Sequence, residues 1–263
     1  MSCSPQKTLD LAVSCVNRLV RAALTSDRQI RHKGPIDLVT DLDFQVEQAI
    51  VALLRQRHPD HLILAEETHN DSLEIRNSQR PFWFLDPIDG TTNLAHRLPV
   101  FCLSLALVHP PQEIICGLVH APLLRETYRA RLNQGATLNG KPISASRTDS
   151  LQEALLATGF AYDVHQSERD NLDLFSHFLK RCRGIRRMGS AALDLCWVAC
   201  GRFDGYWEEK LKPWDLAAGV LIAREAGASV SAPGGLPFDL FSGAALAAAP
   251  SLHPTLVREI LPF

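Results

Sequence analysis

The amino-acid sequence predicts a mixed α/β protein built from two halves. In the first half, two stretches with helical spacing precede a series of short apolar segments that are typical of strands. After about residue 142, predicted strands and helices alternate, as they do where helices cover a sheet. We therefore expect an α+β half at residues 1–141 and an α/β half at residues 142–263.

The first half begins with two predicted helices. Apolar residues recur at helical spacing over residues 5–25, and Thr40 with Asp43 forms the capping-box pattern that precedes a second helix. Short apolar strands at 62–65 and 82–85 then run directly into acidic residues. The rest of this half is predicted as a meander of strands that closes in turns, with strands at 100–108, 114–119 and 127–130 and turns at 135–140.

The second half is predicted from alternating patterns. Gly227 stands where a glycine commonly ends a helix with a positive φ. The expected elements are a strand at 155–158, helices near 168–180 and 190–200, a strand at 203–208, a helix at 216–226, a strand at 244–249 and a short final helix.

The composition is ordinary for a soluble globular enzyme, with 46% hydrophobic and 21% charged residues. A net charge of −2 and the lack of Lys/Arg-rich runs give no reason to expect a nucleic-acid partner. Charges interrupt every apolar run and residues 1–6 lack a signal-peptide pattern, so we expect no membrane association. Seven cysteines without CxxC spacing favour a reducing, cytoplasmic compartment.

Acidic residues follow three segments that we expect to end at the rim of a sheet. Glu66 and Glu67 follow the first short strand, and Asp86 and Asp89 follow the second. Asp215 follows Pro-Trp in the second half. A strand that stops at a carboxylate and turns sharply places that carboxylate at the sheet edge, so these side chains could converge.

The run DPIDGTTN at residues 86–93 has several features that suit phosphate binding. Pro87 fixes its own φ and stiffens the turn, and Gly90 permits close backbone approach or a positive φ. Thr91 and Thr92 are candidate N-caps of a following helix. Free N–H groups at such a helix start can hold a phosphate.

Converging carboxylates require a cation. Two carboxylates 4 Å apart repel by about 4 kcal/mol at an effective dielectric constant near 20. Oxygen ligands without His or Cys select hard ions, chiefly magnesium. Two or three such ions could neutralise the acids and bind a phosphate dianion. The pattern therefore predicts a magnesium-dependent phosphomonoesterase.

Each motif also has a purely structural interpretation. Alone, a Glu pair is most often a solvated strand end, Asp-Pro a turn, and Trp-Asp a packed Trp beside an N-cap. A second motif, Asp41-Leu42-Asp43, has the spacing of haloacid-dehalogenase-type phosphatases, but it enters a helix directly. P-loop, dinucleotide-binding and zinc signatures are absent. Together, the long acidic run after an apolar strand favours the magnesium site.

These motifs, in this order, resemble the inositol monophosphatase family of lithium-sensitive, magnesium-dependent phosphatases, and bacterial members most. The resemblance covers nearly the whole chain. It rests on residues 37–40 with Asp43, Glu66-Glu67, the run 86–93, residues 117–119 before Ala121-Pro122, and residues 135–140, 157–160, 189–194 and 211–215.

The resemblance implies a layered α/β/α/β/α sandwich of the sugar-phosphatase type, usually dimeric, with the site between the halves. It implies direct in-line attack of water on phosphorus, without a phosphoenzyme. Thr91 with Asp43 would orient and activate that water, and Glu67 would support the site through waters. Magnesium, two or three ions per site, would be bound by Glu66, Asp86, the Ile88 carbonyl, Asp89 and Asp215.

The resemblance also implies the substrate contacts. The backbone of Gly90 and Thr91 would hold the phosphate. The substrate's hydroxyls would face Gly189, Ser190, Ala191 and Glu208. The metal-binding positions Glu66, Ile88, Asp89 and Asp215 would border the substrate as well.

Some positions depart from the family pattern. Ala65, Arg97 and Lys210 stand where members usually carry Gly. Arg97 and Lys210 add positive charge near the expected site, which would favour a more anionic substrate unless both point to solvent. His32, with Lys33 beside it, stands where many animal members carry Lys, which bears on a weaker third metal.

The expected reaction is hydrolysis of inositol monophosphate to myo-inositol and phosphate. Thr92-Asn93 supports it, because the nucleotide-phosphate branch typically carries Lys-Glu there, and Glu208 supports it as a hydroxyl-binding acid. The alternative on the same scaffold is a histidinol-phosphate or broad sugar-phosphate phosphatase. A non-catalytic regulatory binding protein would be marked by the loss of a ligand carboxylate, and none is lost. Lithium inhibition and a homodimer are further expectations.

Overall fold

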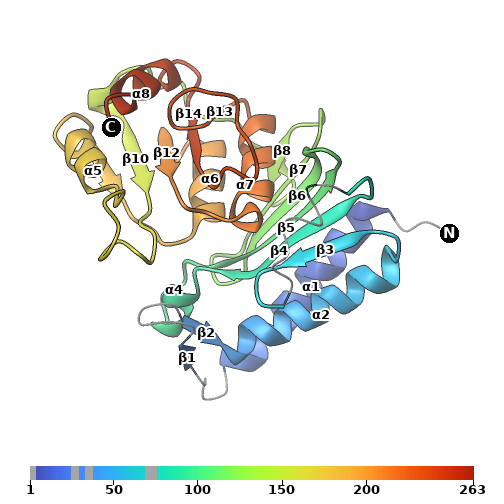
Figure 1. Ribbon diagram of the computed structural model, residues 1–263. Helices are drawn as coiled ribbons and strands as arrows, with labels where there is room; N and C mark the ends of the chain where they lie inside the picture. Colours follow the sequence, from blue (N-terminus) through green and yellow to red (C-terminus); the bar gives the residue numbers. More distant parts are fainter. Residues whose placement is uncertain (1–3, 25–29, 33–37, 69–75, 77) are drawn as a thin grey trace.

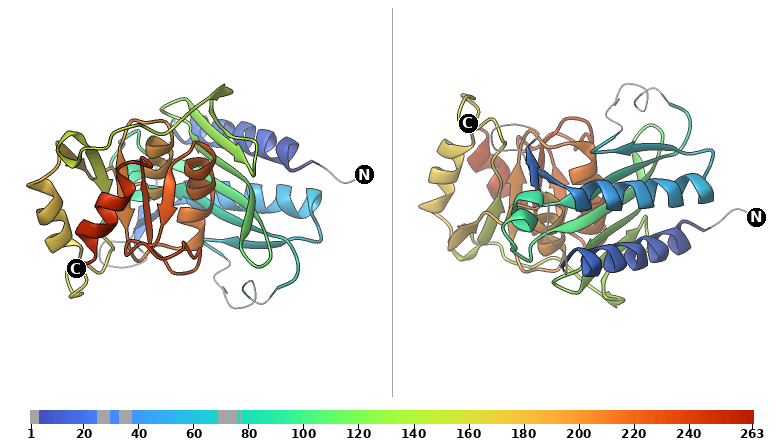
Figure 2. Two further views of the ribbon diagram at one scale, coloured as in Figure 1. Left: turned by 90° about the horizontal axis from the view of Figure 1, so that it is seen from above. Right: turned by 90° about the horizontal axis from the view of Figure 1, so that it is seen from below.

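The computed structural model describes residues 4–24, 30–32, 38–68, 76 and 78–263. Within these ranges the helices and strands stack in layers, which Figures 1 and 2 show from three directions. The positions Lys33 and Asp37, which the sequence patterns single out, lie outside the described residues. None of the described helices has the length and apolar character that a membrane span requires.

A seven-stranded sheet forms the centre of the first half, and α1 (Pro5–Leu24) and α2 (Asp41–Arg57) cover one of its faces (Figure 1). Its strand order is sequential from β3 to β9; β3 and β4 are parallel and the later pairs antiparallel. The strands are β3 (Leu62–Ala65), β4 (Phe82–Asp89), β5 (Cys102–His109), β6 (Glu113–Ala121), β7 (Glu126–Arg131), β8 (Ala136–Leu138) and β9 (Lys141–Pro142).

A five-stranded sheet with the order β11-β10-β12-β14-β13 forms the centre of the second half. Its strands are β10 (Leu155–Thr158), β11 (Gly184–Arg186), β12 (Gly205–Glu208), β13 (Ser229–Ser231) and β14 (Ala245–Ala248). Between the two sheets lie α6 (Ala191–Ala199) and α7 (Pro213–Glu225), and α5 (Leu172–Leu179) with α8 (His253–Ile260) covers the far face. Smaller elements are β1 (Ile30–His32), β2 (Leu38–Thr40), α4 (Thr91–Ala95) and η1 (Leu151–Glu153).

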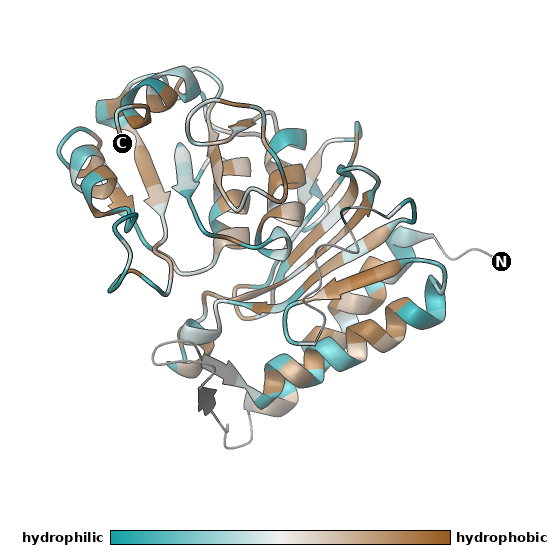
Figure 3. Cartoon of the chain, viewed as in Figure 1, coloured by the Kyte–Doolittle hydropathy of each residue, from teal (hydrophilic) through white to brown (hydrophobic). Residues whose placement is uncertain are grey.

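The apolar run that predicted β4 is buried on both faces. Trp83 and Leu85 belong to the core under α1 and α2, whereas Phe82 and Phe84 belong to the core under α6 and α7. Successive side chains of a strand point to opposite faces, so a strand between two helical layers must be apolar throughout. Figure 3 shows hydrophobic residues along the central strands. The layered α/β/α/β/α sandwich is confirmed.

The observed elements differ from the predicted ones where segments are short. Residues 135–140, predicted only as a turn-rich closure, contain β8, and the strands β9, β11 and β13 were not predicted. Each of these strands has two or three residues, which is too short for a periodic signal. The predicted boundary at residue 141 falls at β9, and the division into two halves stays a prediction.

Candidate active site

One cavity of about 530 Å³ is lined by segments from both sheets and from the helices between them. Its walls come from the end of β4, the start of α4, residues 159–162 after β10, residues 187–191 at the start of α6, and residues 208–215 between β12 and α7. Its acidic lining residues are Glu66, Asp86, Asp89, Glu208, Glu209 and Asp215. The fold therefore gathers five of the predicted acids, Glu66, Asp86, Asp89, Glu208 and Asp215, around one space.

The strand β4 does not stop at Asp86, as the sequence pattern suggested, but continues to Asp89. Asp86 is opposite Ser104 and Asp89 is opposite Cys102. Between these two pairs β4 advances by three residues and β5 by two, so β4 contains one extra residue. This β-bulge lies between Asp86 and Asp89 and so includes Pro87, which has no N–H to donate to a neighbouring strand. The N–H of the following residue donates to Asp86 Oδ1 at 2.9 Å, which holds that carboxylate against the bulge.

Asp89 joins the first sheet to α6. Its Oδ2 accepts a hydrogen bond from the Ser190 hydroxyl at 2.8 Å and from the Ala192 N–H at 2.7 Å. A carboxylate at a helix N-terminus is stabilised there by the free N–H groups and the helix dipole. Both donors bind the same oxygen.

Asp215 lies in the first turn of α7, so the prediction that it follows a strand was wrong. Pro213 occupies the first turn of this helix, where its missing N–H costs nothing. Asp215 Oδ2 accepts the N–H of Lys212 at 2.7 Å. The Ser104 hydroxyl donates to the Trp214 carbonyl at 2.8 Å, which ties this helix start to β5 beside Asp86.

The acids of the cavity destabilise one another's charged forms. Burial raises the pKa of Asp86 well above its ordinary value, and the charges of Glu66 and Asp89 add to this effect. Burial likewise raises the pKa of Asp215 well above its ordinary range and the pKa of Asp89 to about 6. Buried like charges of this kind must hold protons or cations.

The donor set fits a hard divalent ion. Ile88, whose carbonyl could supplement the carboxylates, also lines the cavity, and no His or Cys among the described residues does. In the described part of the chain, no three His, Cys, Asp or Glu side chains already surround one point as ligands of an ion would. The acids thus border a space that a cation could enter.

The helix α4 begins at Thr91 with Gly90 as its N-cap, so the prediction of Thr91 and Thr92 as N-caps was wrong. Gly90 has φ 102°, and a Cβ on it would lie 2.9 Å from the carbonyl oxygen of Val100. Only glycine fits this conformation and this space. The turn directs Thr91 toward α2 instead.

Thr91 meets the carboxylate of the predicted capping box. Its Oγ1 lies 2.9 Å from Asp43 Oδ1 and 3.1 Å from the Ile88 carbonyl oxygen. Asp43 Oδ2 accepts the N–H of Thr40 at 2.9 Å, which confirms the capping box of α2. Burial raises the pKa of Asp43, although its hydrogen bonds act in the opposite direction.

The residues that the resemblance assigns to the substrate line the same cavity: Gly189, Ser190, Ala191 and Glu208. Glu208 Oε2 accepts the Tyr206 hydroxyl at 2.7 Å, and burial raises the pKa of Glu208 to about 7. A Cβ on Gly159 would lie 2.1 Å from Glu208 Oε1, so this glycine makes room for the carboxylate.

Comparison with known proteins agrees with this geometry. A family model described as the inositol monophosphatase family matches residues 7–261. The chain belongs to the inositol monophosphatase family. It is therefore a phosphatase, a phosphoric monoester hydrolase, and magnesium dependence is a property of its family.

Proteins of known sequence or structure are similar to this chain over most of its length. The inositol-1-monophosphatase of Synechocystis is 46% identical over 235 residues, 89% of this chain and 80% of that protein. The Nus factor SuhB of Vibrio cholerae is 40% identical over 233 residues, 88% of this chain and 85% of that protein. The solved inositol monophosphatase from Anabaena has a TM-score of 0.85 and 35% identity, with 98% of this chain and 96% of that chain covered.

Three residues of this inositol monophosphatase site were not predicted. Arg187 lines the cavity and its charge lowers the pKa of Glu208, and Tyr206 binds that same carboxylate. Glu47 is fully buried and accepts the N–H of Glu67 at 2.7 Å. Sequence patterns could have identified two of these residues. Glu47 lies one turn after a capping acid on an apolar helix face, and Tyr206 shares a strand face with Glu208. Arg187 carries no local signal.

Other predicted residues lie beside the cavity rather than in it. Asp43 and Glu67 do not line it, and neither does Asp41 of the alternative phosphatase motif. Arg97 is exposed and outside the cavity. Lys210 lines the cavity, but other residues hold its ammonium group: Nζ donates to Asp163 Oδ2 at 2.7 Å and to Ser167 Oγ at 2.6 Å.

Proposed function

We propose that this enzyme hydrolyses inositol monophosphate to myo-inositol and phosphate with the help of magnesium. The observation that carries the proposal is the cavity that Glu66, Asp86, Asp89 and Asp215 line together with Glu208. The first four acids can bind cations, and the fifth can bind the hydroxyls of a polyol. A phosphorylated polyol would present both chemical groups at once.

The proposed magnesium ligands are Glu66, Asp86, the Ile88 carbonyl, Asp89 and Asp215. When bound, two or three magnesium ions would supply the positive charge that neutralises these acids, draws in the phosphate and stabilises the leaving oxygen. The raised pKa values of Asp86 and Asp215 support this assignment, because a cation would replace the protons these groups otherwise retain.

Thr91 and Asp43 are the proposed pair that orients and activates the water. When the Thr91 hydroxyl donates to Asp43, its lone pairs remain free to accept a hydrogen from a water in the cavity. The water oxygen attacks phosphorus opposite the ester oxygen and the water gives up a proton, the P–O ester bond breaks, and its electron pair leaves with the polyol oxygen, which takes up a proton. Glu67 would support the site through waters.

The substrate would be held at both ends. The N–H groups of Gly90 and Thr91, at the start of α4, would donate to the phosphate. Glu208 would accept hydroxyls of the polyol, with the segment Gly189, Ser190 and Ala191 beside it. A pKa near 7 means that a substantial part of Glu208 is the accepting carboxylate at neutral pH.

Steady-state rates on three substrates test this proposal. Inositol monophosphate, histidinol phosphate and fructose bisphosphate would be compared in added magnesium and after removal of divalent cations. We expect inositol monophosphate to have the highest kcat/KM and every rate to vanish without the cation. A preference for histidinol phosphate would instead support the alternative phosphatase on this scaffold.

A regulatory binding role is the second candidate function. It is favoured by relatives from Vibrio cholerae and Pasteurella multocida that are Nus factor SuhB proteins, 40% and 38% identical to this chain. Failure of the purified protein to release phosphate from any of the three substrates in added magnesium would support this role over the catalytic one.

We also propose three further properties, of which the dimer and the lithium inhibition follow from the family resemblance and the compartment follows from the cysteine pattern. The protein would act as a cytoplasmic homodimer, and lithium would inhibit it. Light scattering gives the mass in solution, fractionation gives the compartment, and a lithium titration of phosphate release tests the inhibition. A monomer, a membrane-bound fraction or an unchanged rate would each contradict the respective proposal.

A further inference from the structure

A second pocket of about 680 Å³ lies between α1 and the turn that joins β6 to β7. None of its lining residues lines the active-site cavity. One wall comes from the C-terminal half of α1 and the other from residues 120–127. The pocket is therefore separate from the proposed chemistry.

The floor of this pocket is a fixed polar network. His120 is buried, its Nδ1 lies 2.9 Å from Thr127 Oγ1, and its Nε2 lies 3.0 Å from Asn17 Oδ1. Burial lowers the pKa of His120 to about 4, so the ring is neutral at pH 7. Among the described residues, no hydrogen bond uses the amide N–H groups of Asn17, which remain available to a ligand.

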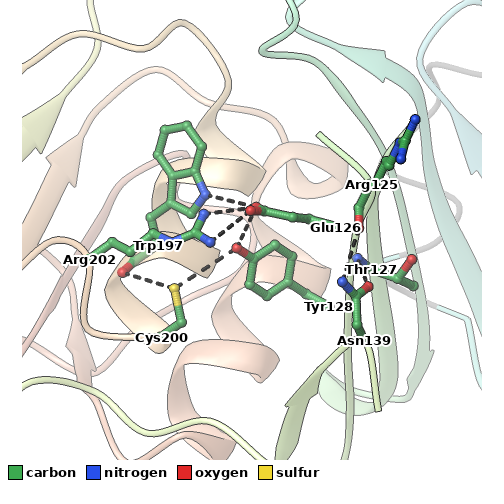
Figure 4. Close-up of polar contacts among 8 residues, drawn as sticks. All are labelled: Arg125, Glu126, Thr127, Tyr128, Asn139, Trp197, Cys200 and Arg202. Carbon is green, nitrogen blue, oxygen red and sulfur yellow. Dashed lines mark hydrogen bonds and ion pairs between the residues drawn. The ribbon is translucent and has the colours of Figure 1, made fainter. Parts of the chain in front are cut away.

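The described charged residues of the pocket are all positive. Arg21 and Arg125 line it, and no Asp or Glu among the described residues does. Neither guanidinium forms an ion pair with another described residue. The adjacent acid, Glu126, points the other way: its carboxylate binds Arg202 at 2.7 Å and the Tyr128 hydroxyl at 2.8 Å, whereas Arg125 extends away from it (Figure 4).

The remaining walls are apolar. Val13 and Val20 contribute from α1, and Leu123 contributes from the turn opposite. Two guanidinium groups above an apolar wall and a polar floor form an amphipathic site, which neither a simple ion nor an uncharged apolar molecule would satisfy alone.

We propose that this pocket binds a small organic anion. Its anionic group would pair with Arg21 and Arg125, and its apolar body would pack against Val13, Val20 and Leu123. A carboxylate, sulfonate or phosphate on a ring or short chain has the required chemistry.

Calorimetric titration with 1-naphthalenesulfonate tests the proposal, because a sulfonate is not a phosphate ester and cannot be hydrolysed. The full chain would be cleared of divalent cations on a chelating resin and kept at low ionic strength. In that state the acidic active site repels anions, and the arginine pairs are least screened. We expect one saturable site, and at least tenfold weaker binding in Arg21→Gln and in Arg125→Asn.

The variants are chosen to preserve the fold. Both arginines are exposed, and Asn suits position 125 because its φ is 57°. Arg18→Gln removes the same charge from the same helix outside the pocket, and it should bind within twofold of the unmodified protein. Uncharged 1-naphthol should bind at least tenfold more weakly. Absence of saturable binding, an equal loss in Arg18→Gln, or equal binding of 1-naphthol would overturn the proposal.

Discussion

The hydroxyl oxygen of Thr91 lies 2.9 Å from Oδ1 of Asp43, although the two residues are 48 positions apart in the sequence. The other oxygen of Asp43 accepts the N–H of Thr40, so the carboxylate is fixed at the start of α2. A residue that caps one helix thereby orients the first residue of another, α4. We propose that this pair acts on the water, and the first prediction follows from it.

Thr91→Ala should lower kcat for inositol monophosphate by about 10²–10⁴-fold, the usual range for loss of general acid–base assistance. KM should change little, because the lost hydroxyl contacts the water and not the substrate. Steady-state kinetics in saturating magnesium measures both. Thr91→Ser keeps the hydroxyl and serves as the control, with kcat much closer to that of the unmodified enzyme. A near-normal kcat in Thr91→Ala would show that the proposed role is wrong.

Asp89→Asn should abolish most of the activity and raise the magnesium concentration needed for the remainder. The amide oxygen can still accept from Ser190 and Ala192, so the connection to α6 is kept while the charge is lost. Rates measured against magnesium concentration give both effects. Asp60→Asn, at an exposed position outside the cavity, is the matched control. An unchanged magnesium requirement in Asp89→Asn would exclude this carboxylate as a ligand.

The sequence predicts the layers of this fold well because long elements carry a periodic signal. Residues 82–85 read as a buried strand because both faces of β4 contact helices. Glu66, Asp86, Asp89 and Asp215 line one cavity, but the sequence did not predict all of their local structures. Pro213 and Asp215 suit a helix start as much as a turn after a strand, and in the structure they lie in the first turn of α7, which the Ser104 hydroxyl of β5 holds at the Trp214 carbonyl.

A residue that the tertiary fold alone brings to the site cannot be predicted as a site residue from local sequence patterns. Arg187 follows a three-residue strand, β11, that exists because it pairs with β10. Its guanidinium enters the cavity from there, next to Glu208. No spacing or motif around this residue distinguishes it from an exposed arginine, so only the arrangement of strands identifies it.

Arg97→Gly should raise the free energy of unfolding by up to about 1 kcal/mol. Arg97 and Lys210 have φ 62° and 61°, in the left-handed region that favours Gly. A left-handed conformation costs an L-residue about 1–2 kcal/mol, which the entropy cost of Gly, about 0.5–1 kcal/mol, offsets only in part. Urea denaturation measures the change.

Lys210→Gly is the matched comparison for that prediction. It relieves the same backbone strain but also removes the hydrogen bonds of the ammonium group to Asp163 and Ser167. We therefore expect a smaller gain than in Arg97→Gly, or a loss. Equal stabilisation by both substitutions would mean that the contacts of Lys210 contribute nothing to stability.

In the cation-free protein, the contribution of Asp89 and Glu208 to the free energy of unfolding should decrease as the pH rises from about 4 to about 7. Burial raises the pKa of Asp89 to about 6 and that of Glu208 to about 7, whereas both groups ionise near pH 4 in an unfolded chain. Between these values the folded chain retains protons that the unfolded chain has lost. The free energy of unfolding therefore decreases with pH in this window, by about 1.4 kcal/mol for each unit of pKa difference, and levels off above it.

Magnesium and a single substitution separate this component from the rest of the titration. The lowered pKa of His120 acts in the opposite sense, since the unfolded chain binds a proton there first as the pH falls. That contribution is the same with and without magnesium, so the difference between the two urea-denaturation series gives the contribution of the acids to the free energy of unfolding.

We expect magnesium to stabilise the protein more at pH 7 than at pH 5. In Glu208→Gln without the cation, the fall between pH 5 and pH 7 should be smaller, because the amide keeps an acceptor for Tyr206 but does not titrate. A magnesium effect that is equal at both pH values would contradict the assignment of Asp89 to cation binding.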